Sequence, residues 1–176
     1  MFILGWLVNI VTFPGVVLHE SAHKFFCDIS KVKVHEVSYF RFGDPSGYVL
    51  HGEVDSLRKS FAISIGPLLI NTLACAILCF PVGLAYFILE IQEGTLALNI
   101  LGWIGFSCGM HAFPSNQDVT SLTENIKSSK KGLLYFSTLS FALLIKLANL
   151  LSFFWFDLIY AIGISMAIPY FLLKYV

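Results

Sequence analysis

Long apolar runs dominate this 176-residue chain and constrain its fold more than any other feature. Five can be distinguished, separated by polar or turn-forming residues: about 2–27, 61–89, 96–113, 133–156 and 158–173. Most approach or exceed the roughly 20 residues that a helix needs to cross a bilayer. The runs predict an all-α polytopic membrane protein with about five transmembrane helices.

The composition supports the same fold class. Apolar residues make up 57% of the chain and charged residues 12%, whereas about 25% of the residues of soluble proteins are charged. A soluble domain of this size could not bury so much apolar surface behind a polar exterior. The composition therefore excludes a soluble cytosolic enzyme and a disordered chain, and the lack of a basic excess excludes a nucleic-acid binder.

Basic residues gather on alternate loops. Ten of the eleven lie between the first and second runs, between the third and fourth, or at the C-terminus, whereas the other loops carry only Glu90, Glu93 and Asp157. The positive-inside rule then predicts a cell-membrane protein with its N-terminus outside and its C-terminus in the cytoplasm. Lys146 lies within the fourth run, where it is either a functional residue or extends its amine to the interface.

A turn signal lies between the first two apolar runs. Residues 34–42 and 48–54 are rich in β-branched and aromatic residues, and the sequence GDPSG separates them at 43–47. Such a pattern predicts two strands joined by a turn. We expect a small membrane-associated β-hairpin at about 34–54, on the cytoplasmic side.

The motif that carries chemistry is HESAH at 19–23, near the end of the first run. On a helix, His19 and His23 project from one face, one turn apart. Two imidazoles at this spacing bind one Zn²⁺, and Glu20 lies beside the metal, where it serves as a general base. Ionisable residues are expensive in an apolar span unless they pair or bind a ligand.

Catalytic zinc sites usually have three protein ligands, so one more is needed. Asp118 is favoured because it follows the third run, on the side where the histidines are expected, and Pro114 breaks the helix just before it. His111 competes for the same role. Asp28, in the interface loop, and Asp157, on the opposite face, are poorer candidates.

The second run begins with the sequence GPLLIN at 66–71. Gly66 and Pro67 loosen the start of a helix and allow another backbone to approach closely. Asn71 offers a donor and an acceptor within the apolar region. This amide either faces a substrate or links helices by hydrogen bonds.

In this order the motifs resemble the site-2 protease family of intramembrane zinc metalloproteases. The resemblance covers residues 1–120, a three-span catalytic core that includes the hairpin. It implies one zinc ion per chain at His19, His23 and Asp118, with Glu20 as general base and Asn71 near the substrate. Gly66, Pro67 and Asn116 are expected in the same substrate-binding region. Residues 121–132 would form a cytoplasmic loop and 133–176 a two-helix transmembrane extension.

The expected activity is hydrolysis of a peptide bond in or near a transmembrane segment. The expected partners are a membrane-protein or peptide substrate, the lipid bilayer and a regulatory membrane protein. One alternative is a non-catalytic membrane scaffold or partner subunit with a structural metal. Another is a metal transporter, which would need ligands spread along several spans rather than gathered at one depth.

Overall fold

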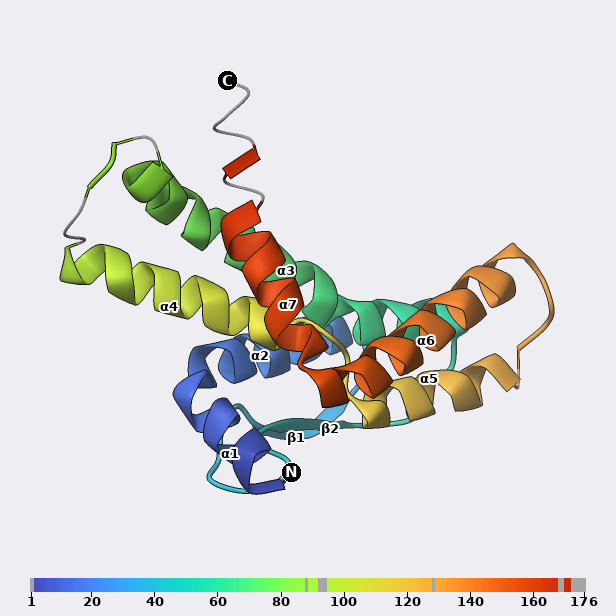
Figure 1. Cartoon of the computed structure of the whole chain (residues 1–176). Helices are drawn as coiled ribbons and strands as arrows, with labels where there is room; N and C mark the ends of the chain where they lie inside the picture. Colours follow the sequence, from blue (N-terminus) through green and yellow to red (C-terminus); the bar gives the residue numbers. More distant parts are fainter. Residues whose placement is uncertain (1, 88, 92–94, 128, 168–169, 172–176) are drawn as a thin grey trace.

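The computed structural model describes residues 2–87, 89–91, 95–127, 129–167 and 170–171 (Figure 1). These residues are mostly helical, with one two-stranded sheet, so the expectation of a helical chain with a small hairpin is confirmed. The α-helices are α1 (Phe2–Val11), α2 (Phe13–Ile29), α3 (Leu57–Phe87), α4 (Leu96–Met110), α5 (Asn116–Lys127), α6 (Leu133–Leu151) and α7 (Phe156–Ile162). A 3-10 turn (Ser152–Phe154) joins α6 to α7, and a π-helical turn (Gly163–Ala167) follows α7.

The first apolar run is two helices rather than one span. α1 ends at Val11 and α2 begins at Phe13, with Thr12 between them. Pro14 explains the break, because proline lacks an amide hydrogen and its ring collides with the carbonyl one turn earlier. The hydroxyl of Thr12 donates to the Val8 carbonyl at 2.6 Å. The expected single span over residues 2–27 is therefore wrong.

The β-hairpin forms where the turn signal predicted it. β1 (Val34–Ser38) pairs antiparallel with β2 (Tyr48–His51), and the register places Ser38 opposite Tyr48. Both strands contact α2 and lie along its side in Figure 1. The hairpin therefore covers the helix that carries the two histidines.

Helices α2, α3 and α4 pack together as a three-helix unit. Contacts between His23 and Ile63, and between Gly15 and Asn71, show that α2 and α3 are antiparallel. A buried cluster of Cys75, Cys79 and Cys108 joins α3 to α4. Helix α2 is therefore held in place by α3 and α4 as well as by the hairpin.

Residues 121–127, expected in a loop, belong to α5. Ser115 and Asp118 cap this helix reciprocally: the Ser115 amide donates to Asp118 Oδ2 at 2.7 Å, and the Asp118 amide donates to Ser115 Oγ at 3.2 Å. Val119, Leu122 and Ile126 form an apolar stripe that packs with α6 and α3. The helix was not expected within the loop because this stripe is short and lies in an otherwise polar segment.

The helices α6 and α7 do not pack together as the expected tight hairpin. α7 diverges from α6 and packs on α4 (Figure 1). The hydroxyls of Thr72 and Tyr160 lie 2.6 Å apart, and the rings of Phe87 and Tyr170 are centred 5.7 Å apart. Residues 160–167 and Tyr170 therefore lie beside α3, in the same order along its direction. The expected fifth span reached 173, and residues 172 and 173 lie outside the described residues.

Two described helical segments, Leu57–Phe87 and Leu133–Phe154, are long and apolar enough to cross a membrane. Leu96–Met110 and Phe156–Ala167 are apolar but shorter. Lys146 is exposed on α6.

Candidate metal centre

Two histidines on one face of α2 form the base of the site. His19 and His23 are one turn apart, 8% and 5% exposed, and their ring centroids are separated by 4.8 Å. The i,i+4 spacing on a helix is sufficient to bring the rings together. This part of the site follows directly from the local sequence.

Each imidazole is oriented by a backbone carbonyl. His19 Nδ1 lies 2.8 Å from the His111 carbonyl oxygen, and His23 Nδ1 lies 3.1 Å from that of Ile63. A carbonyl only accepts, so both Nδ1 atoms carry a proton, and the Nε2 atoms are the ring nitrogens left to face a metal. Metal-binding histidines usually have such a second hydrogen bond, which sets the tautomer and the ring orientation.

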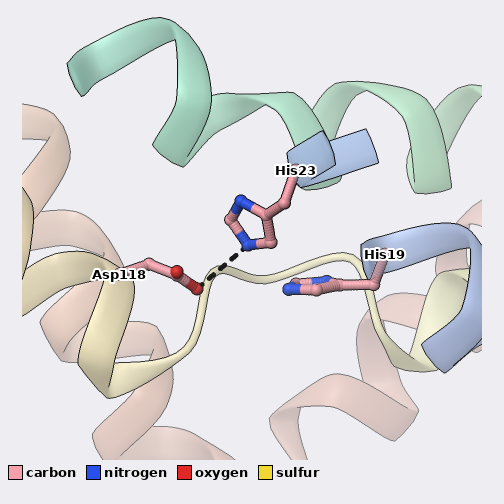
Figure 2. A group of neighbouring side chains, drawn as sticks. All are labelled: His19, His23 and Asp118. Carbon is pink, nitrogen blue, oxygen red and sulfur yellow. Dashed lines mark ion pairs between the residues drawn. The ribbon is translucent and has the colours of Figure 1, made fainter. Parts of the chain in front are cut away.

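Asp118 completes a group of three from the first turn of α5. Its Oδ2 lies 3.2 Å from His23 Nε2, and Figure 2 shows the three side chains directed toward one another. One ligand atom from each residue lies within 4.8 Å of the others. Ligands about 2.1 Å from one zinc ion are roughly 3.4 Å apart in a tetrahedron, so binding requires shifts on the order of 1 Å.

The hydrogen bonding of His23 and the ionisation of Asp118 fit a bound cation. His23 Nε2 is buried and lies 3.2 Å from Asp118 Oδ2 without the alignment of a hydrogen bond, and such a polar atom is costly to bury without a ligand. Burial acts to raise the pKa of Asp118, but the neighbouring His23, together with His19 and the Ser115 side chain, outweighs it and holds that pKa below its ordinary value. Two imidazole nitrogens and one carboxylate oxygen suit zinc and also other transition metals.

Glu20 lies beside this group without belonging to it. The residue is buried, with 9% of its surface exposed, and it lines the same cavity as the histidines. Gly47 makes room for it, because a Cβ at that position would lie 2.7 Å from Glu20 Cγ. Glu20 therefore stands in the hairpin-covered part of the site, within the cavity and outside the group of three ligands.

The cavity that contains these groups has a volume of about 500 Å³. Its walls come from α2, the hairpin, the segment between α4 and α5, and the junction of α6 with α7. Asn116, expected in the substrate-binding region, lines this cavity and also accepts a hydrogen bond from Asn149 at 3.1 Å. The space is large enough for an extended segment of polypeptide.

Asn71, Gly66 and Pro67 do not line this cavity. Asn71 is fully buried, and its amide donates to the carbonyls of Gly15 at 3.1 Å and His111 at 2.8 Å. The face of Gly66 lies against the Phe26 ring. Gly66 and Asn71 therefore lie in the interface of α2 and α3, and Pro67 is buried. Of the two roles that the sequence left open for Asn71, the hydrogen bonds fit the linking of helices.

Asn71 instead supports the first histidine. The His111 carbonyl accepts both the Asn71 amide and the His19 ring, so the asparagine holds the acceptor that orients His19. Asn71→Leu should lower metal affinity by about 10- to 100-fold, the usual effect of removing a group that orients a ligand.

Competition with a chelating dye would measure this change. Asn99→Leu is the matched control, because Asn99 is exposed on α4 and accepts a hydrogen bond only from Tyr86 among the described residues. Unchanged metal affinity in a folded Asn71→Leu protein would contradict this role, and Asn71→Gln should recover part of the affinity.

The other candidates for the third ligand lie elsewhere. His111 Nε2 lies 2.7 Å from the Thr12 hydroxyl and is not in the group of three. Asp28 forms an exposed ion pair with Lys24 at 2.6 Å. Asp157 was placed on the opposite face, but it lines the metal cavity and accepts from Ser152 at 2.9 Å.

Sequence reasoning missed the contribution of the C-terminal region. Asn149, Ser152 and Asp157 all line the cavity. Three polar residues within nine positions of an apolar stretch were the available signal, because apolar spans rarely contain them without a function. Only the packing of α7 on α4 shows that these residues lie at the cavity.

Comparisons with protein-family models, with curated proteins and with solved structures find no match to this chain.

Proposed function

We propose that this chain is an intramembrane zinc metalloprotease of the site-2 protease type. The observation that carries the proposal is the group of His19, His23 and Asp118, with the buried carboxyl of Glu20 beside it in one cavity. This is the ligand set and the adjacent base that metal-assisted hydrolysis needs.

His19, His23 and Asp118 would hold the zinc ion. When bound, zinc supplies a Lewis acid that activates water and a peptide carbonyl. Glu20 takes a proton from the attacking water and later delivers it to the leaving amine, while the water oxygen becomes part of the new carboxyl group. The Nδ1 hydrogen bonds keep both imidazoles in the orientation that binding requires.

The hairpin offers a means of presenting the substrate. Peptide bonds in a helix are shielded, so the substrate must be unwound before hydrolysis. The sheet has only two strands among the described residues, and Tyr48, Val49 and His51 of β2 line the cavity. An extended segment that adds to the sheet would pass along the cavity, as in other cases of strand addition.

A scaffold with a structural metal is the weaker proposal. Structural zinc sites are usually closed by four protein ligands, whereas catalytic sites leave one position open. The described residues bring three ligands together next to a cavity of about 500 Å³. This arrangement favours an open, catalytic site.

We further propose that the chain is a multi-pass protein of the cell membrane. The two long apolar helices support this, as do the many exposed large apolar side chains, among them Leu73, Ile77 and Leu144. The basic loops favour an outer N-terminus, with α2, α3 and α4 crossing in alternate directions.

The direction of residues 160–167 changes the proposed location of the C-terminus. This segment runs parallel to α3, and Tyr170 lies beside Phe87, which favours one broken crossing made by α6 and α7 together rather than two. Tags inserted at Gly94 and after Val176 should therefore report the same, outer side, whereas a tag at Lys130 should report the cytoplasm. Protease protection in sealed vesicles measures this, and a cytoplasmic tag after Val176 would restore the model with five crossings.

The experiment that tests the function is an assay in proteoliposomes. Purified chain, loaded with zinc, is mixed with a single-span membrane protein, and the fragments are compared with those produced by Glu20→Gln.

A further inference from the structure

A second, smaller cavity adjoins the metal cavity. It has a volume of about 210 Å³ and is walled by one face of α1 and by the junction between α6 and α7. Gly5 and Val8 form the α1 wall, and Phe153, Trp155 and Leu158 form the other. We call this space the apolar recess.

The recess lies next to the cavity that contains the metal ligands. The two cavities share Asn9, Met110, His111, Ser152 and Asp157 as lining residues. His111 is also the residue whose carbonyl orients His19. A side chain that enters the recess therefore lies close to His19, the first of the three proposed metal ligands.

The lining changes from polar to apolar along this path. The shared boundary carries mostly polar side chains, whereas the far walls carry aliphatic and aromatic ones. Gly5 lines this space, and a Cβ at this position would meet nothing within 4 Å, so a larger side chain can be introduced there. A volume of about 210 Å³ accommodates one large side chain and not a folded segment.

We propose that the apolar recess receives one large apolar side chain of the polypeptide, next to the bond that is cleaved. This inference rests on the proposed proteolytic function and deepens it, because it assigns the residue preference to the face of α1 and to the C-terminal junction. Substrates with Phe, Leu or Met beside the cleaved bond would be favoured over those with Ala or Gly.

The first test measures binding without cleavage. In Gly5→Cys, the introduced thiol reports occupancy of the recess through its rate of alkylation by N-ethylmaleimide. The four native cysteines are buried and compete little: Cys27, Cys75, Cys79 and Cys108. With zinc bound, phenylalanine hydroxamate should slow alkylation by about tenfold, and alanine hydroxamate should have little effect, because only the benzyl group reaches the apolar walls.

Gly132→Cys is the matched control, because a Cβ at Gly132 also meets nothing within 4 Å and Gly132 lines neither cavity. Its alkylation should be insensitive to both hydroxamates. Equal effects of the two hydroxamates at position 5, or no effect, would overturn the proposal. A thiol at position 5 that is unreactive throughout would show that detergent or lipid fills the recess, which also overturns it.

The second test uses cleavage. Gly5→Phe fills the recess, so cleavage sites in an unfolded protein such as casein should move about tenfold toward bonds flanked by Ala or Gly. Gly132→Phe should cleave as the unmodified chain does. Proteolysis with an unchanged site preference in Gly5→Phe would reject the recess as a side-chain pocket and leave the proposed proteolytic function standing. Selective protection of the thiol at position 5 without any Glu20-dependent proteolysis would reject the proteolytic function and leave the pocket standing.

Discussion

Glu20→Gln should abolish peptide-bond cleavage while leaving the metal in place. The amide keeps the size of the side chain and its fit against Gly47, but it cannot accept a proton from water. Loss of a general base typically lowers the rate by about 10²- to 10⁴-fold. Fragment analysis of a single-span substrate measures the rate, and elemental analysis of the same sample measures the metal.

Glu124→Gln is the matched control, because Glu124 is exposed on α5 and does not line the cavity. This variant should cleave at the unmodified rate. If Glu20→Gln lost metal as fully as a histidine variant, Glu20 would be a ligand. If it retained full cleavage, Glu20 would not be the base.

His19→Ala, His23→Ala and Asp118→Asn should each lower zinc affinity by about an order of magnitude or more, and activity should fall with it. Each removes one of the three atoms that converge on the same space. The unmodified chain should bind about one zinc ion, because the described residues form a single group of this kind. Asp118→Asn is the most informative variant, since it removes the charge and keeps the shape.

Asp28→Asn is the control for the carboxylate, because Asp28 pairs with Lys24 at the surface and is not in the group of three. Its zinc content should be unchanged. Retention of metal and activity in Asp118→Asn, together with their loss in His111→Ala, would make His111 the third ligand. Thermal unfolding of each variant separates loss of a ligand from loss of the fold.

The local sequence determined the parts of the molecule that depend on neighbouring residues. The i,i+4 spacing of His19 and His23 was sufficient to bring their rings together, because helix geometry alone sets that distance. The hairpin followed from two strand-forming stretches around a turn rich in Gly and Pro. For Asp118, the sequence indicated the residue but not the contact, since it lies far from the histidines along the chain.

Tertiary packing decided the remainder. Asn71 offered a donor that was equally suited to a substrate or to a neighbouring helix, and only the packing of α2 against α3 showed which carbonyls it meets. The apolar pattern of residues 133–173 did not show which helix α7 packs beside, and only the contacts of Tyr160 and Tyr170 with α3 show that the chain after Phe156 runs alongside α3. That path brings Asp157 to the metal cavity, because hydrophobic periodicity specifies which residues are buried and not which helix they pack against.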